Sequence, residues 1–248
     1  FYRFLKAKSG KSNNIKSINS SNRPGLSLED PKEIAIELNQ YFKSVFNPNL
    51  SDTPYPVFSC STINVTKEGV RKLLSDLKPG KAPGPDGLKK SDLCLAIDEV
   101  SSILTIVFQY SLDMGRLPMK WKKANVVPIF KSGNKQSATN YRPVSLTCIC
   151  SKMLEHIILH NMSSKLNDIL MPQQHGFRKG LFCTGQLLTT TQSIMREVDV
   201  GGCVQAAVLD FSKAFDKVSH SLLMSKLFNF GFSSDILSWI LDFLSDRS

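Results

Sequence analysis

Apolar residues recur every three or four positions along much of the chain, a spacing that predicts amphipathic helices. The N-terminal example begins at Asp30, which is suited to cap a helix, with Pro31 in the first turn and Glu33 at the capping-box position. The stripe that this helix would bury consists of Ile34, Leu38, Tyr41, Phe42 and Val45. Further helices are predicted at residues 66–77, 91–114, 151–169, 184–198, 219–229 and 234–245.

Three segments have the composition of β-strands instead. Residues 121–130 and 141–147 flank a polar loop, and together they predict a β-hairpin with basic residues on its rim. The third segment, CVQAAVLDF at residues 203–211, is nearly all apolar before its aspartate, so we expect both faces of this strand to be covered. Because helices precede a mixture of strands and helices, the predicted fold class is α+β rather than a doubly wound parallel sheet.

The positive charge of the chain, +10, is unevenly distributed. Residues 1–28 contain six Lys or Arg and no acid, and residues 114–154 contain eight and again no acid. For the first run, a solvent-exposed face without a binding role is as good an explanation as a surface that binds polyanions. The second run covers strand and turn segments rather than one helix face, so it predicts a surface that meets polyanions such as nucleic acids.

Composition argues against several other classes of protein. No apolar run approaches the roughly 18 residues needed to span a bilayer, and residues 1–10 lack the features of a signal peptide. The six cysteines form no CxxC pair and the four histidines show no metal-ligand spacing, so reduced thiols in an intracellular protein are expected. The glycines near residues 80–87 fail the spacing of a phosphate loop. The missing initiator Met leads us to expect a fragment of a longer protein.

Asp210 is the candidate for a catalytic, metal-binding residue, because it stands where the predicted strand emerges from the core. A carboxylate there is costly unless it is paired or binds a cation, and its hard oxygens suit Mg²⁺. A capping aspartate at a strand-to-helix turn explains the spacing equally well. Phe215 would face the same cleft and crowd the sugar of a bound nucleotide, whereas Asp216 is expected to be a structural or surface charge.

Five sequence blocks in consistent order resemble reverse transcriptases of non-LTR (LINE-type, jockey-like) retrotransposons. The likeness runs from about residue 28 to residue 248. The blocks are PGKAPGPDGL, ANVVPIFKSGN with NYRPVSLT, QHGFRKG, the CVQAAVLDFSKAFDKVSH segment that is similar to motif A, and HSLLMSKLFNFGF with WILDFLSDR.

The resemblance implies a right-hand polymerase fold with fingers and a partial palm that stops before the Asp-Asp motif. Before the likeness begins, the polar, Ser/Asn-rich composition predicts a basic flexible arm (1–27). The resemblance divides the rest into a helical N-terminal extension (28–115), fingers (116–202) and the start of an incomplete palm (203–248). No Tyr/Phe-x-Asp-Asp stretch occurs in the sequence, so we expect this chain alone to be inactive and, with half a palm, poorly soluble.

Roles at the catalytic centre also follow from the resemblance. It implies that Asp210 is a catalytic ligand of two Mg²⁺ ions, with the Phe211 carbonyl as a second oxygen, and that Phe215 excludes ribonucleotides. It further implies that Lys131 and Arg142 hold the triphosphate of the incoming dNTP. Chemistry agrees, because a Lys and an Arg on a hairpin rim can neutralise a polyphosphate, although a solvated turn lysine remains an alternative for Lys131.

The QHGFRKG block, at residues 174–180, is basic with an aromatic residue between, which suits a nucleic-acid template. Arg178 and Lys179 are the candidates for phosphate contact, while Phe177 is equally suited to a core. Lys81 is a further template candidate, unless its loop is a lid packed on the fingers. The family usually has Arg-Ser where residues 181–182 are Leu-Phe, which weakens the prediction of template contact at this turn.

The parent protein implied by the resemblance is an RNA-directed DNA polymerase that adds dNTPs to a primer 3′-OH. Its partners would be an RNA template from its own element, a DNA primer or target DNA, and no membrane. It would act in the nucleus and travel through the cytoplasm as a ribonucleoprotein. Alternatives are a non-catalytic RNA-binding module or decayed transposon relic, and a reverse transcriptase of the group II intron or telomerase type.

Overall fold

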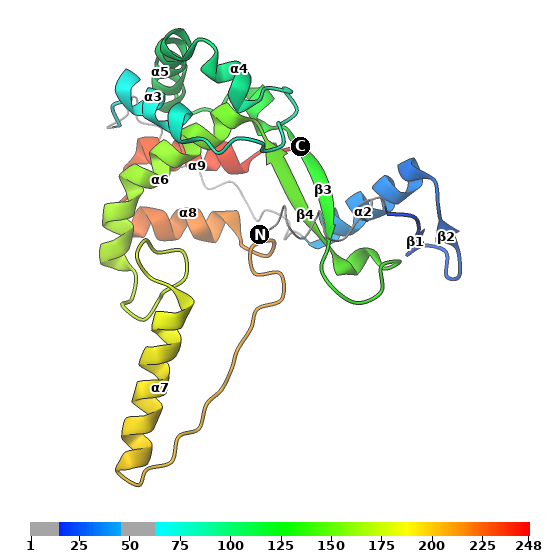
Figure 1. Ribbon diagram of the computed structural model, residues 1–248, viewed down its shortest axis with the longest axis vertical. Helices are drawn as coiled ribbons and strands as arrows, with labels where there is room; N and C mark the ends of the chain where they lie inside the picture. Colours follow the sequence, from blue (N-terminus) through cyan, green and yellow to red (C-terminus); the bar gives the residue numbers. More distant parts are fainter. Residues whose placement is uncertain (1–14, 46–62) are drawn as a thin grey trace.

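Helices supply the main core of the protein. The computed structural model describes residues 15–45 and 63–248, a mixture of helices and two small antiparallel sheets (Figure 1). The helices of the main core are α3 (Lys67–Asp76), α4 (Lys90–Cys94), α5 (Ile97–Asp113), α6 (Ile149–Ile169), α8 (His220–Asn229) and α9 (Ser234–Leu244). They bury a continuous apolar cluster that includes Phe108 and Leu154, both 0% exposed. None of the helices in the described residues is long and apolar enough to cross a bilayer.

Local side-chain chemistry explains where these helices begin. Asp30 Oδ2 accepts hydrogen bonds from the first-turn amides of α2 (Pro31–Val45), and Thr66 Oγ1 accepts one from Gly69 N at 3.2 Å at the start of α3. The helices predicted from periodicity are confirmed, with one difference. The single helix expected at 91–114 is divided into α4 and α5, because Ala96 leaves the helical conformation (φ −131°, ψ 59°).

The predicted hairpin is formed by β3 (Ala124–Phe130) and β4 (Tyr141–Thr147). Short 3-10 turns, Met119–Lys122 and Ala138–Asn140, precede the two strands. The outer edge of β3 also binds Ser248, since Ala124 N donates to Ser248 O at 2.8 Å and Ser248 N donates to Lys122 O at 3.3 Å, the pattern of a parallel bridge.

The hairpin tip is covered by the N-terminal part of the chain. Strands β1 (Ile18–Asn19) and β2 (Ser27–Leu28) pair with each other, and Ile18 is fully buried in a second apolar cluster with residues of α2 and Tyr141 of β4. Asn19 N also donates to Gln136 O at 2.7 Å in the hairpin loop. The prediction of a flexible arm is therefore wrong for residues 15–27; residues 1–14 lie outside the described part of the chain.

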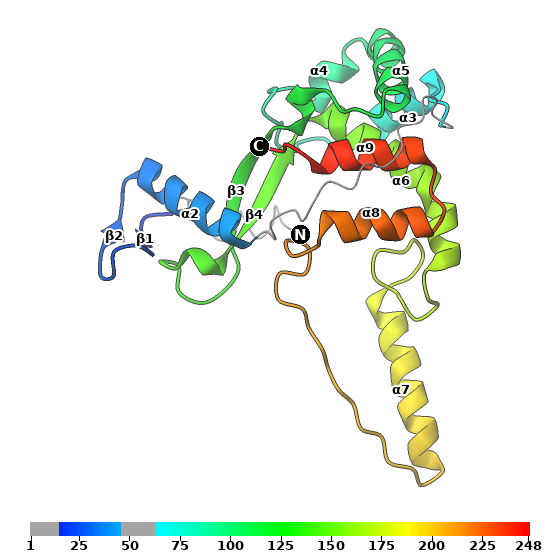
Figure 2. The same ribbon diagram turned by 180° about the vertical axis from the view of Figure 1, so that it is seen from behind.

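Helix α7 (Cys183–Asp199) and the segment after it extend away from the helical core (Figures 1 and 2). The segment 203–211 forms no strand, and its Val208 and Leu209 side chains are 95% and 86% exposed. The predicted strand with two covered faces is therefore wrong. A strand is stabilised by a ladder partner and by packing on its faces, and the described residues provide neither beside this segment.

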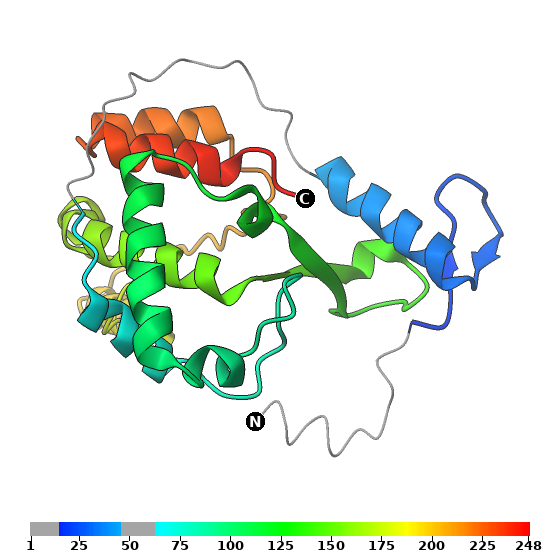
Figure 3. The same ribbon diagram turned by 90° about the horizontal axis from the view of Figure 1, so that it is seen from above.

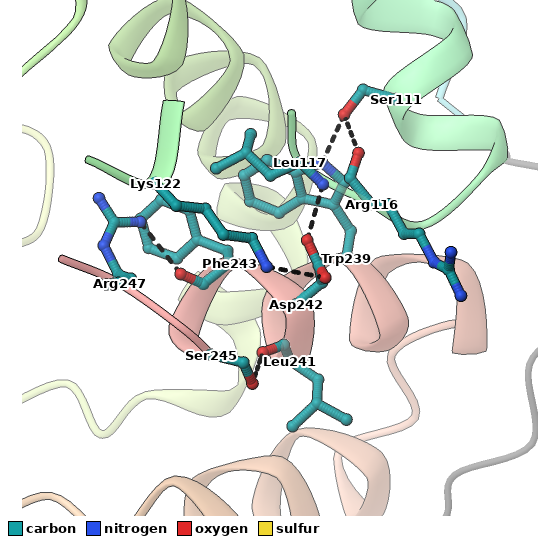
Figure 4. Close-up of polar contacts among 10 residues, drawn as sticks. All are labelled: Ser111, Arg116, Leu117, Lys122, Trp239, Leu241, Asp242, Phe243, Ser245 and Arg247. Atoms are coloured by element: carbon teal, nitrogen blue, oxygen red, sulfur yellow. Dashed lines mark hydrogen bonds and ion pairs between the residues drawn. The ribbon is translucent and has the colours of Figure 1, made fainter. Parts of the chain in front are cut away.

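The C-terminal helix α9 is fixed to α5 and to the segment that precedes β3 by a largely buried polar network (Figure 4). Asp242 accepts a hydrogen bond from Leu117 N at 2.7 Å and pairs with Lys122 Nζ at 2.9 Å. Trp239 Nε1 donates to Ser111 Oγ at 3.1 Å. These contacts connect segments more than a hundred residues apart, and they hold α9 against α5 and the hairpin base.

Candidate functional site

The β3–β4 hairpin presents two cations on one face, next to its loop. Ile129 lies opposite Arg142 in the register of the two strands. Lys131 follows Ile129 by two residues, and Lys131 N donates to Asn140 O at 2.8 Å, which continues the pairing. Because side chains alternate between the faces of a strand, Lys131 and Arg142 emerge on the same face.

This face combines charge with exposed apolar surface. Val127 and Val144 lie opposite each other and are 42% and 38% exposed, and Ile129 is 39% exposed. The other face carries Phe130, whose ring centroid lies 5.6 Å from Lys135 Nζ. The cationic face can therefore neutralise a polyphosphate while its valines and isoleucine contact the less polar part of the same ligand.

Asp210 lies in an exposed segment that ends in a tight turn. The turn is closed by hydrogen bonds from Lys217 N to Lys213 O at 3.2 Å and from Val218 N to Phe215 O at 3.3 Å. No ion pair with another described residue engages the Asp210 carboxylate. The sequence placed Asp210 at the end of a buried strand; the structure places it in open chain, with its oxygens accessible.

The chemistry of the donors in this segment fits Mg²⁺. The Asp210 carboxylate and the Phe211 carbonyl are hard oxygens, and both residues are exposed. Within the described residues, no group of three or more His, Cys, Asp or Glu side chains could hold a metal ion by itself. Mg²⁺ takes few carboxylates and completes its shell with water and substrate phosphates, so these two oxygens fit as part of a set.

The predicted gate residue, Phe215, packs against a ring from the QHGFRKG segment. The ring centroids of Phe177 and Phe215 are 5.7 Å apart and their planes meet at 87°. Phe177 has φ 61°, an uncommon conformation for a bulky residue, and is 93% exposed. The alternative that Phe177 fills a core is therefore wrong, and the segment predicted to meet the template lies beside the predicted gate.

Arg178 has a structural partner that the sequence did not predict. Its guanidinium donates to Met171 O at 3.0 Å and to Asn167 O at 3.4 Å, so it binds carbonyls at the C-terminal end of α6. Lys179 is exposed and remains a candidate for phosphate contact. The charge of Arg178 stays near the surface, but its hydrogen-bonding groups are partly used within the protein.

The loop that carries Lys81 packs on the end of the hairpin, as the view from above shows (Figure 3). A Cβ atom on Gly84 would lie 2.5 Å from Cys148 N and 2.7 Å from the carbonyl carbon of Thr147. This close approach supports the interpretation of the loop as a lid on the fingers. Lys81 itself is exposed, so a template contact stays a prediction.

One contact at the Asp210 turn had no signal in the sequence. Lys213 Nζ lies 4.1 Å from the centroid of the Tyr41 ring and donates to its hydroxyl, although the two residues are 172 positions apart. Periodicity placed Tyr41 in a buried stripe, and Tyr41 is partly buried against the N-terminal cluster. The pattern could not show that the ring also meets Lys213.

Comparison with known protein families identifies the class of protein to which this site belongs. Residues 129–248 match the family described as reverse transcriptase (RNA-dependent DNA polymerase). The matched range contains the hairpin cations, the QHGFRKG segment and the Asp210 turn. Residues 129–248 are therefore similar to the reverse transcriptase family, which implies a polymerase fold of mixed helix and sheet for this range.

The individual relatives are proteins of retrotransposable elements, the jockey element among them. The chain is 29% identical over 199 residues to the RNA-directed DNA polymerase from mobile element jockey of Drosophila melanogaster, covering 79% of this chain and 21% of that protein. It is 32% identical over 165 residues to the jockey polymerase of Drosophila funebris, covering 65% of this chain and 18% of the relative. The Pol polyprotein from retrotransposable element R2 of Popillia japonica is 28% identical over 186 residues, 74% of this chain and 25% of that protein. The chain thus spans about a fifth of the length of the jockey relatives, and these relatives support a polymerase fragment over a non-catalytic module.

Proposed function

We propose that this chain supplies the incoming-nucleotide contacts and the first metal ligand of an RNA-directed DNA polymerase that copies the RNA of a retrotransposon. The observation that carries the proposal is the hairpin face on which Lys131 and Arg142 emerge together. Arg142 can bind phosphate oxygens in a bidentate manner, and Lys131 adds a second charge beside it. In this role the pair binds and orients the triphosphate of a dNTP.

The Asp210 segment has a complementary role in the proposal. Asp210 and the Phe211 carbonyl would hold Mg²⁺, which stabilises charge on phosphate oxygens when bound. Phe215 would restrict the space at the sugar, with Phe177 supporting its ring, so that a 2′-OH is excluded. The complete enzyme would use two Mg²⁺ ions. Because two-metal phosphoryl transfer needs more than one carboxylate to hold both ions, it would also need metal ligands besides Asp210 and the Phe211 carbonyl.

The partners follow from the class of enzyme. We infer an RNA template, derived from the element itself, and a DNA primer or target end as the nucleic-acid partners, with Lys179, Lys81 and the outer surface of Arg178 as template contacts. The protein would act in the nucleus and pass through the cytoplasm as a ribonucleoprotein.

The hairpin assignment is tested by primer extension with the full-length polymerase. Arg142→Ala and Lys131→Ala should each raise the KM for dNTP about tenfold or more, because each removes a charge-assisted hydrogen bond. Lys135→Ala is the matched control, since this lysine of the same hairpin contacts Phe130 on the other face. Equal effects of all three substitutions would contradict the assignment.

The non-catalytic alternative makes a different prediction about Asp210. In a polymerase, Asp210→Asn should abolish primer extension and leave RNA affinity unchanged within about twofold, because the carboxylate faces a metal rather than the template. An RNA-binding module would show salt-dependent binding with no Mg²⁺ requirement and no extension by the wild-type protein.

A further inference from the structure

The turn after Asp210 is attached to a distant helix by one lysine. Lys213 has φ 53°, in the left-handed region that non-glycine residues seldom occupy. Its ammonium lies over the Tyr41 ring of α2 and donates to the Tyr41 hydroxyl. An uncommon backbone conformation persists where surrounding contacts fix it, so Tyr41 is a candidate for the residue that fixes this turn.

The position of Lys213 bears directly on Asp210. Lys213 follows Asp210 by three positions, and a lysine side chain is long and flexible enough to pair with a nearby carboxylate. Such a pair would compete with a cation for the same oxygens. In the structure the ammonium is engaged by the aromatic ring instead, and no ion pair with a described residue engages Asp210.

Helix α2 also connects this turn to the hairpin that carries the two cations. Ile34 and Leu38 of α2 belong to the apolar cluster that contains Tyr141 of β4, and Tyr41 packs against the same cluster. Figures 1 and 2 show α2 beside the hairpin tip. Tyr41 therefore packs on the cluster that α2 shares with the hairpin and also contacts Lys213 of the Asp210 turn.

We propose that Tyr41 is a positioning residue, which holds Lys213 away from Asp210 and thereby keeps the Asp210 carboxylate free for Mg²⁺. The inference rests on the proposed function and assigns to the N-terminal helix a part in organising the metal site. Tyr41 touches neither substrate nor metal in this role; it acts through Lys213. Both properties of the phenol contribute, since the ring face attracts the ammonium and the hydroxyl oxygen accepts a hydrogen bond from it.

The first experiment measures the attachment itself, by hydrogen–deuterium exchange of the full-length polymerase. The amides of Lys217 and Val218 close the turn, so their exchange reports its stability. Tyr41→Leu should accelerate their exchange about two- to fivefold, the size expected for an exposed cation–π contact. Tyr41→Phe keeps the ring and should show a smaller effect. Unchanged exchange in Tyr41→Leu would overturn the proposal, whether or not the enzyme is active.

The second experiment separates the charge effect from simple packing. The Mg²⁺ concentration at half-maximal primer extension should rise about threefold in Tyr41→Leu, because the released ammonium then pairs with Asp210. The double variant Tyr41→Leu/Lys213→Met should return to the wild-type midpoint, since no ammonium remains to compete. A double variant that stays as impaired as the single one would assign Tyr41 a packing role only.

Two further results keep the outcomes distinct. Phe42→Leu is the matched control, because Phe42 packs on the same cluster beside Tyr41 and its ring centroid lies 5.9 Å from that of Tyr41. It should leave the Mg²⁺ midpoint unchanged, and a rise equal to that of Tyr41→Leu would overturn the proposal. A wild-type enzyme without extension at any Mg²⁺ concentration would refute the proposed function, while the exchange experiment would still decide whether Tyr41 fixes the turn.

Discussion

At the scale of single residues, the ion pair between Lys122 and Asp242 combines burial with charge. The side chain of Lys122 is 3% exposed and that of Asp242 is 27% exposed. Asp242→Asn would keep an acceptor for Leu117 N but leave the ammonium without its counter-charge. Because one end of the pair reaches solvent, we expect a loss of about 2 kcal/mol in the free energy of unfolding.

Urea titration of the chain at low protein concentration measures this loss. Asp246→Asn is the control, since Asp246 is exposed on the adjacent turn and its positive φ of 52° is one that asparagine tolerates. Similar stabilities for the two variants would show that the buried pair contributes no more than a surface carboxylate.

Glu155 provides a pH-dependent test of the core. Burial raises the pKa of the Glu155 carboxyl above its ordinary value of 4.5, and the hydrogen bond from Ser151 Oγ at 3.1 Å only partly offsets this. Between the unfolded and the folded pKa, the folded chain binds more protons, so its stability falls as the pH rises through that window.

Glu155→Gln removes this titration and keeps an acceptor for Ser151. The variant should therefore gain stability relative to the wild-type chain as the pH rises from below 4.5 to neutrality. Unfolding titrations at the two ends of that range measure the change. A stability difference that is the same at both pH values would contradict the assignment.

Some parts of the site could be predicted from the sequence, and others required the fold. Lys131 and Arg142 flank a loop between two strands, so their common face follows from strand periodicity alone. The hydrogen bonds of Arg178 depend on the path of the chain after α6, and the contact between Tyr41 and Lys213 depends on tertiary packing. Neither leaves a periodic signal.

At the scale of elements, helices were predictable because capping and periodicity act locally. Asp30 and Thr66 fix helix starts through hydrogen bonds within three residues of themselves. The segment 203–211 has strand composition, but a strand also needs a partner, and propensity cannot supply one. The division at Ala96 was missed because it involves no glycine or proline.

The loop at residues 78–88 gives a prediction at this scale. Gly84→Ala should destabilise the chain by about 1–3 kcal/mol, because the added Cβ would lie 2.5 Å from Cys148 N, and a backbone atom cannot move aside as the end of a flexible side chain could. Gly176→Ala is the control, since no atom lies within 4 Å of its added Cβ. Thermal unfolding compares the two, and equal midpoints would show that the loop does not pack on the hairpin base.

At the scale of the whole molecule, exposed apolar surface extends well beyond the cationic hairpin face. Much of it lies on α7 and on residues 203–215, where Val208 and Phe211 are 95% and 81% exposed. That much exposed apolar surface supports the expectation of poor solubility, which remains a prediction. Of the eight basic residues between 114 and 154, Lys122 is buried in an ion pair, which leaves seven to face solvent.

These seven exposed basic residues predict that the chain binds RNA with an affinity that falls as the salt concentration rises. Each phosphate neutralised on a single strand contributes about −0.7 to the slope of log affinity against log salt. Lys131 and Arg142 share one exposed face, so the double variant Lys131→Ala/Arg142→Ala should make the slope shallower by about 1.4. Lys226→Ala on α8, outside the acid-free stretch, should leave the slope unchanged.

Fluorescence anisotropy of a labelled single-stranded RNA at several salt concentrations measures the slopes. An unchanged slope in the double variant would place the polyanion-binding surface elsewhere on the molecule and separate it from the proposed nucleotide site.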